Sequence, residues 1–253
     1  MTTSTTIVTC YYRIKSKHSP EKYDQWIANF LSTVQTNTVL FTSPDLQNTL
    51  YDKCSEILKT RIKIVPLPPE DLPLAQKYRT LWDQQYKMDR QKQNGRTKEC
   101  YILWNSKLWF LMQAIRDNPF QSDKFVWTDI GCLRDINSEI QSKLAKYPLY
   151  DNISETQLDI VLLQPFQETK SFFQDEIHFS GAIFGGHTEV IKKVHDLFYE
   201  RLDAFIKQGL FVGCDQQTMA SVYMTNSELF HTIAPPFDAW IDPWFYLWQF
   251  YSV

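Results

Sequence analysis

Residues 6–65 alternate between short, β-branched apolar runs and longer segments whose apolar residues recur at helical spacing. The two longer segments begin at Ser19-Pro20 and Ser43-Pro44, and serine followed by proline is a typical helix start. Strand, helix, strand, helix and strand in this order predict a parallel sheet covered by helices. We expect the three strands over Thr6–Tyr12, Thr38–Thr42 and Ile62–Val65.

The rest of the chain continues this pattern. A helix over residues 98–116 precedes an apolar run typical of a central strand, and a long helix over residues 188–208 carries a regular apolar stripe. Further strands are expected over Lys124–Thr128, Leu158–Leu163 and Ile177–Phe184. With no internal repeat or linker, residues 1–253 are expected to form one α/β domain with a mostly parallel sheet flanked by helices.

Composition excludes several classes of protein. With 43% hydrophobic and 22% charged residues, the chain is not of the disordered type. Its formal net charge of −3 argues against general nucleic-acid binding, and the interspersed acidic and basic residues argue against a polybasic route to a membrane. No apolar run is long enough to predict a membrane span, and the first residues lack a secretory signal pattern. Five scattered cysteines without CxxC spacing favour reduced thiols, so a cytoplasmic location is expected.

Asp129 and Gly131 directly follow the predicted strand over Lys124–Thr128. In open α/β sheets ligands bind beyond the carboxyl ends of strands, and a carboxylate there can take a divalent cation that bridges a diphosphate. The alternative is that Asp129 caps a turn and Gly131 provides the turn geometry.

Lys107 falls on the apolar face of its predicted helix, together with Leu108 and Leu111. A desolvated ammonium needs an anionic partner or a route to water. A phosphate near the end of the Asp129 strand would provide such a partner. The alternative is that the aliphatic stem lies along the apolar surface and the ammonium reaches water.

Five of the seven glycines fall between Gly181 and Gly213, and Gly185-Gly186 is placed between a predicted strand and a predicted helix. Glycine there permits close approach of a ligand to the backbone, although a tight turn is the common alternative. Asp215-Gln216 opens a further helix: Asp215 is either its N-cap or a general-base carboxylate, and Gln216 could hydrogen-bond a sugar hydroxyl.

The five histidines lack the compact spacing of a metal site, and His231 alone is kept as a candidate ligand. The segment 235–253 is crowded with aromatic rings that could pack over the sheet, stack on sugars or form an oligomer contact. These rings belong to Phe237, Trp240, Trp244, Phe245, Tyr246, Trp248, Phe250 and Tyr251.

Five motifs in order together resemble the HtrL/YibB (WlaTC-like) family, regarded as glycosyltransferases with a GT-A-like nucleotide-sugar fold. The resemblance covers almost the whole chain. The motifs are Ile7-Val-Thr-Cys-Tyr-Tyr-Arg13, Leu103-Trp-Asn-Ser-Lys107, Phe125-Val-Trp-Thr-Asp-Ile-Gly131, Gly181-Ala-Ile-Phe-Gly-Gly186 and Asp215-Gln216.

The resemblance implies that Tyr11, Tyr12 and Arg13 cradle a nucleoside and that Lys107 approaches its diphosphate. Asp129 would stand where GT-A enzymes place an Asp-x-Asp motif, whose second aspartate is here Gly131. A Mn²⁺ or Mg²⁺ ion would then be bound by Asp129 with help from His231, or metal dependence would be weak. The pair Gly185-Gly186 and Asp215 would border the donor sugar and the acceptor.

The function expected from these features is transfer of a sugar from a nucleotide-diphosphate donor, uridine-linked, to a glycan acceptor in polysaccharide or glycan synthesis. Asp215 is the candidate base, and the cation and Lys107 would stabilise the departing diphosphate. A non-catalytic glycan- or partner-binding protein that uses the aromatic segment 235–253 is the alternative. A pyrophosphorylase is disfavoured because no glycine-rich phosphate loop lies near the amino terminus.

Overall fold

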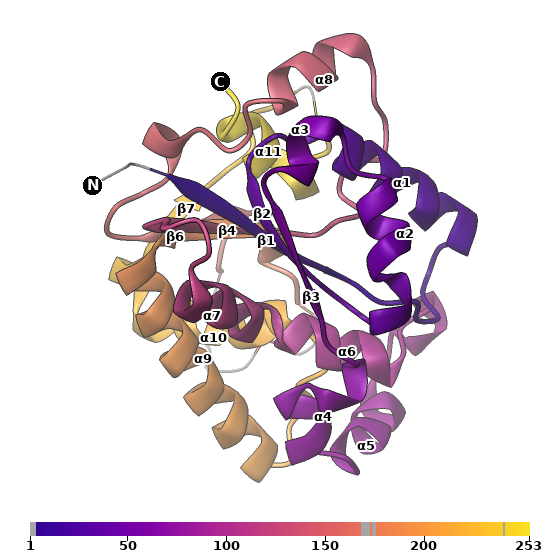
Figure 1. Cartoon of the computed structure of the whole chain (residues 1–253). Coiled ribbons are helices and arrows are strands. Elements are labelled where there is room, and N and C mark those ends of the chain that lie inside the picture. Colours follow the sequence, from indigo (N-terminus) through magenta and orange to yellow (C-terminus); the bar gives the residue numbers. More distant parts are fainter. Residues whose placement is uncertain (1–3, 168–172, 174–175, 240) are drawn as a thin grey trace.

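The computed structural model describes residues 4–167, 173, 176–239 and 241–253. Its centre is a seven-stranded sheet with the order β3-β2-β1-β4-β6-β5-β7 (Figure 1). The three strands expected in the first 65 residues are confirmed, each within a residue or two of its predicted bounds. The strands are β1 (Thr5–Tyr11), β2 (Asn37–Thr42), β3 (Ile62–Pro66), β4 (Lys124–Thr128), β5 (Leu158–Leu162), β6 (Phe179–His187) and β7 (Phe230–Ile233).

The sheet is mostly parallel. Strands β1 to β4 pair in parallel, β6 runs antiparallel to both β4 and β5, and β7 pairs in parallel with β5. Within the described part of the chain, β6 alone therefore opposes the common direction. The predicted mostly parallel α/β sheet flanked by helices is confirmed, and the arrangement is consistent with a Rossmann-like, GT-A-type fold.

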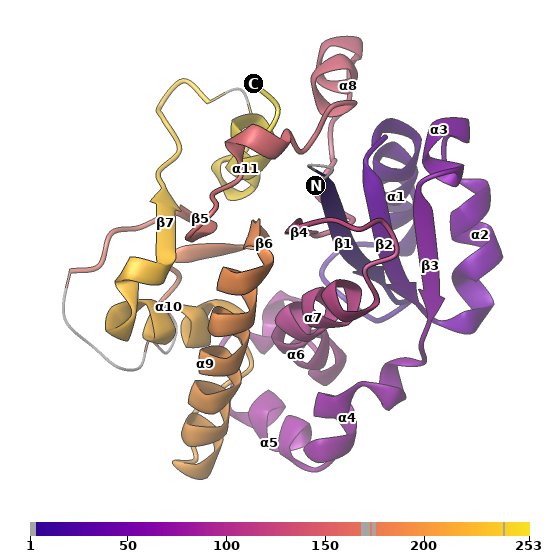
Figure 2. The same cartoon turned by 60° about the vertical axis from the view of Figure 1, so that its left-hand side comes forward.

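Helices cover both faces of the sheet (Figure 2). Successive strand residues point to opposite faces, so Ile7 joins the cluster beneath α1 and Val8 joins the cluster beneath α7. The first face carries α1 (Pro20–Thr33), α2 (Gln47–Asp52), α3 (Glu56–Lys59), α8 (Ser138–Leu144) and α11 (Tyr246–Phe250). The second carries α4 (Pro73–Lys77), α5 (Leu81–Met88), α6 (Lys98–Asn105), α7 (Lys107–Asp117), α9 (Thr188–Lys207) and α10 (Asp215–Thr225).

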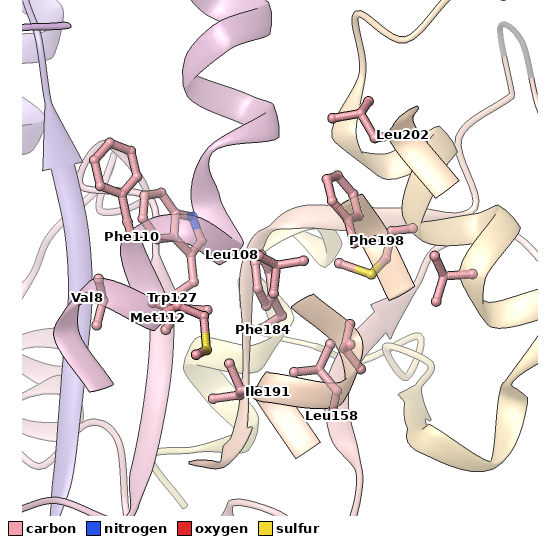
Figure 3. Close-up of a cluster of buried hydrophobic side chains, with 14 of the residues drawn as sticks. Val8, Leu108, Phe110, Met112, Trp127, Leu158, Phe184, Ile191, Phe198 and Leu202 are labelled. Atoms are coloured by element: carbon pink, nitrogen blue, oxygen red, sulfur yellow. The ribbon is translucent and has the colours of Figure 1, made fainter. Parts of the chain in front are cut away.

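The larger core lies between the sheet and helices α7 and α9. Figure 3 shows Val8 and Trp127 of the sheet beside Phe110 of α7, and Phe184 beside Ile191 of α9. The apolar stripe expected on the long helix is confirmed, since its core-facing side chains are buried. They are Val190, Ile191, Val194, Phe198, Leu202 and Phe205.

The turn expected at Gly185-Gly186 is not formed, because β6 continues through both residues to His187. Gly185 pairs with Val126 of β4, and a Cβ atom on Gly185 would lie 2.7 Å from the Phe125 carbonyl oxygen. A side chain there would collide with the neighbouring backbone. The glycine therefore permits close contact between two strands, and the sequence pattern taken for a turn reflects packing inside the sheet.

The aromatic segment 235–253 places several of its rings in the core beneath the first face. Trp248 stacks on Tyr147 with ring centroids 3.9 Å apart and donates from Nε1 to the Cys132 sulfur. The Tyr251 hydroxyl donates to the buried Asp159 carboxylate at 2.8 Å. Phe237 is fully exposed, and Trp240 lies outside the described residues.

Replacing Trp248 by alanine is expected to lower the free energy of unfolding by about 3–5 kcal/mol, because a fully buried indole leaves a cavity. Phe237→Ala is the matched control and should change stability by less than about 0.5 kcal/mol, since its ring is exposed. Urea denaturation measures both. Equal effects of the two substitutions would contradict the packing described for this segment.

Candidate functional site

A cavity of about 910 Å³ opens where β1 and β4 end at their carboxyl edges. Ligands in open α/β sheets bind at this edge. The cavity walls come from the end of β1 and the segment after it, from α1, from α6 and its preceding turn, from the end of β4 and the segment after it, and from the 244–245 pair. Six of the predicted site residues line it: Tyr11, Tyr12, Arg13, Lys107, Asp129 and Gly131.

Lys107 lies at the floor of the cavity with all three ammonium donors engaged. Its Nζ atom lies 2.7 Å from the Gly181 carbonyl oxygen, 3.2 Å from Asp129 Oδ1 and 3.4 Å from Asp215 Oδ2. The side chain is only 7% exposed. The partners predicted for this ammonium were phosphates, and the structure provides two carboxylates instead.

The protonation of this cluster follows from burial and charge. Burial by itself lowers the pKa of Lys107, but the carboxylates of Asp129 and Asp215 outweigh it and the pKa is raised. Burial also raises the pKa of Asp215, and Lys107 offsets only part of this effect. The ammonium therefore stays charged at neutral pH, and the cluster in its fully ionised form has one net negative charge.

The position of Lys107 depends on a break in the helix predicted over residues 98–116. The Tyr199 hydroxyl donates to the Asn105 carbonyl oxygen at 2.8 Å and accepts from the Trp109 N–H at 3.2 Å. These two groups would bond to each other in a continuous helix, so the hydroxyl is inserted into the helical ladder. The chain thus forms α6 and α7, and Lys107 is the first residue of α7.

Asp129 presents the one carboxylate among the described residues that line the cavity. Its Oδ1 atom accepts from Trp127 Nε1 at 2.8 Å and faces the Lys107 ammonium, while the side chain as a whole is 38% exposed. The main chain of Asp129 also forms the turn that the alternative interpretation expected, because its carbonyl accepts from the Cys132 N–H at 3.0 Å. Asp129 therefore combines a turn with a carboxylate fixed at the cavity floor.

Asp215 and Gln216 lie behind this floor and are absent from the described cavity lining. Asp215 is buried, and a Cβ atom on Gly181 would lie 3.0 Å from its Oδ2 atom. Gln216 donates from Nε2 to the Phe179 carbonyl oxygen at 2.9 Å, which ties α10 to β6. Asp215 therefore forms an ion pair that holds the Lys107 ammonium. The Gln216 amide hydrogen-bonds the backbone of β6 and does not face the cavity.

His231 is not brought to Asp129. It lies on β7, where its Nδ1 atom forms a hydrogen bond of 2.7 Å with Asp159 Oδ1 of β5. Strand β7 is separated from β4 by three strand spacings, or about 14 Å. A cation bonds its ligands at about 2–2.6 Å, so one ion does not reach both residues. Gly185 and Gly186 pair with Val126 and Phe125 of β4, before the end of the strand where Asp129 lies, and they are absent from the described cavity lining.

The described residues include no group of three His, Cys, Asp or Glu side chains arranged to hold a metal ion. Asp129 is the candidate ligand that faces the cavity, and one of its oxygens already binds Trp127 and Lys107. These residues do not fit a cation held by the protein in the way that the sequence suggested.

Sequence reasoning missed most of the positive charge around the cavity. Lys15, Lys17, Arg96 and Arg134 line it in addition to Arg13 and Lys107. Arg96 is engaged with the buried Asp89 carboxylate at 3.6 Å, whereas the ion pairs of the described residues leave Arg13, Lys15, Lys17 and Arg134 without a carboxylate. The alternation Arg13-x-Lys15-x-Lys17 was the available signal, since alternate residues of an extended chain share one side.

Lys107→Met is expected to destabilise the fold by about 3–5 kcal/mol, because it leaves the buried Asp215 charge unpaired. Adding Asp215→Asn should recover part of the loss, with a coupling energy of about 1–3 kcal/mol in a double-mutant cycle followed by urea denaturation. The exposed pair Lys63 and Asp117 is the control, with coupling below about 1 kcal/mol. Additive effects at Lys107 and Asp215 would contradict the ion pair.

Tyr199→Phe is expected to cost about 1–3 kcal/mol of stability, because the Asn105 carbonyl and the Trp109 N–H both lose a partner. Tyr51→Phe removes the same atom from an exposed ring and should have almost no effect. Thermal or urea unfolding of both variants tests this. An unchanged stability of Tyr199→Phe would mean that the helix closes across the break without cost.

Comparison with known proteins places the chain in a family. No curated protein matches the sequence. In the part of the chain that the structure describes, no helix combines the length and apolar character needed to cross a bilayer. A family model described as "Bacterial protein of unknown function (HtrL_YibB)" matches residues 3–250. The chain therefore belongs to the HtrL_YibB family, as the resemblance in sequence indicated.

Proposed function

We propose that this protein is a glycosyltransferase that moves a sugar from a nucleoside-diphosphate donor to a hydroxyl group of a glycan. One observation carries the proposal: a cavity at the carboxyl edge of a mostly parallel sheet combines cations that have no carboxylate partner among the described residues, aromatic rings and one fixed carboxylate. Cations suit a diphosphate, rings suit a base or a sugar face, and a carboxylate suits hydroxyl groups.

The segment after β1 supports the binding of a nucleoside, and a uridine-linked donor remains our proposal. Tyr11 and Tyr12 line the cavity, and the buried Tyr12 hydroxyl has no hydrogen-bond partner among the described residues. Buried polar groups are normally paired, and this hydroxyl is left unpaired in a residue of the cavity wall. The ribose or the base would supply the missing partner.

The proposed reaction joins the acceptor oxygen to the anomeric carbon of the donor sugar. The bond between that carbon and the diphosphate oxygen breaks, and its electron pair leaves with the diphosphate. The acceptor hydroxyl gives up its proton as the new bond forms. Asp129 is the carboxylate that reaches the cavity, so it replaces the buried Asp215 as our candidate to receive this proton or orient the hydroxyl.

Lys107 supports this chemistry as a positioning residue. With its three donors held by Gly181, Asp129 and Asp215, its ammonium keeps the Asp129 carboxylate in place. Asp215 acts one step further away, since it holds Lys107. We propose that the protein acts in the cytoplasm and takes part in the assembly of a glycan.

The non-catalytic alternative relied on free aromatic rings in the segment 235–253. Phe245, Trp248 and Tyr251 are buried in the core, and Trp244 lines the same cavity as Lys107. The rings thus favour the cavity over a separate aromatic surface as the binding site.

A panel of UDP-, GDP-, CDP- and dTDP-linked sugars tests the function, with donor hydrolysis and transfer to simple glycans as readouts. We expect turnover of at least one donor, and a loss of about 100-fold or more in kcat for Asp129→Asn. The control is Asp45→Asn, which changes an exposed carboxylate outside the described cavity lining. If no donor in the panel is bound or turned over, the proposal is overturned.

A further inference from the structure

We infer that the diphosphate of the donor is held by arginine and lysine side chains and needs no divalent cation, an inference that rests on the function proposed above. The residues are Arg13, Lys15, Lys17 and Arg134, which line the cavity. The prediction of a metal-bound diphosphate placed Arg13 beside the nucleoside and gave no role to Lys15, Lys17 and Arg134. The inference assigns the diphosphate as the ligand of all four side chains.

The donor set at Asp129 is the first argument. A Mg²⁺ ion that also binds substrate phosphates usually takes one or two carboxylates from the protein, and the described cavity lining offers one, Asp129. That carboxylate already faces an ammonium at 3.2 Å and accepts from an indole N–H at 2.8 Å. A divalent ion placed on Asp129 would also meet the repulsion of Lys107 at short range. The Lys107 ammonium thus already supplies the positive charge beside Asp129 that a divalent cation would otherwise supply.

The second argument is the local excess of positive charge. The chain carries a formal net charge of −3, yet the described residues that line the cavity include six Lys or Arg side chains and one carboxylate. Lys107 and Arg96 are paired with carboxylates, and the other four are not. A cavity lined by one sign of charge attracts ions of the opposite sign. Two adjacent phosphates would supply the opposite charge in this cavity.

Arg134 is held in place without an acidic partner. Its guanidinium carbon lies 4.9 Å from the ring centroid of Trp26 and 4.9 Å from that of Phe245, so the side chain is placed between two aromatic rings. Cation–π contacts engage the face of the guanidinium, which leaves its N–H groups along the edge free to donate. Such an edge matches two phosphate oxygens in a bidentate contact.

The segment that carries Arg13, Lys15 and Lys17 is held against the turn before α6. The Lys15 carbonyl accepts from the Thr97 hydroxyl at 3.5 Å. Gly95 has a φ of +79°, and a Cβ atom there would lie 2.6 Å from the Lys17 Cα. The backbone of the cationic segment is therefore fixed before a ligand arrives, which lowers the entropic cost of binding.

His18 lies beside these groups and responds to their charge. Burial lowers its pKa, and the nearby cations of Arg134, Lys17 and Lys22 lower it further. The imidazole is thus neutral at pH 7 and adds no charge of its own. In the transfer step the cations would stabilise the negative charge that the departing diphosphate gains as its bond to the anomeric carbon breaks.

Isothermal titration calorimetry of the full chain with UDP, GDP, CDP, dTDP and inorganic pyrophosphate tests the inference. Each titration is run in excess EDTA and again with MnCl₂. We expect at least one diphosphate to bind with the same Kd in both buffers. Arg134→Gln should weaken that Kd by about tenfold, and so should the double variant Lys15→Gln/Lys17→Gln, whose exposed sites leave the fold intact. Arg79→Gln is the control, with the same charge change at an exposed arginine outside the described lining.

The outcomes separate this inference from the proposed function. Binding that requires MnCl₂, or binding in EDTA that neither cation variant weakens, overturns the inference and leaves a glycosyltransferase possible with another phosphate site. Absence of binding by every probe in both buffers overturns the inference and the proposed function together. Binding in EDTA that falls in both variants, but not in Arg79→Gln, supports the inference.

Discussion

The buried ammonium of Lys107 is the interaction on which the arrangement of the candidate site depends. It joins α7 to β6 through the Gly181 carbonyl, to the end of β4 through Asp129 and to α10 through Asp215. A charge in such a position is tolerated only when its donors are satisfied and opposite charges lie close. Four elements, α7, β4, β6 and α10, are thereby held at one point, and the partly exposed carboxylate of Asp129 faces the cavity.

The reversed direction of β6 makes this cluster possible. Because β6 is antiparallel to β4, its first residues lie beside the end of β4, and the Asp129 N–H donates to the Ala182 carbonyl at 2.8 Å. Gly181 is thus next to the floor of the cavity, while Gly185 lies further along the strand, opposite Val126 in the middle of β4. One strand therefore has one glycine that serves the site and a second that serves packing.

The sequence allowed the prediction of most strands, the parallel sheet and the proximity of Lys107 to Asp129, since local periodicity and the strand-end rule determine these features. The break between α6 and α7 was not predictable, because it depends on the hydroxyl of Tyr199, a residue more than ninety positions away from Asn105. The same holds for Arg134, whose place is set by two rings from distant segments. Long-range contacts of this kind leave no local periodic pattern.

The cavity walls come from four stretches spread between Cys10 and Phe245, so a ligand that filled the cavity would contact both ends of the folding unit at once. Occupancy is therefore linked to global unfolding and not to the opening of one loop. For a ligand that binds only the native state, saturation at a hundred times its dissociation constant adds about 2.7 kcal/mol to the stability of the whole domain.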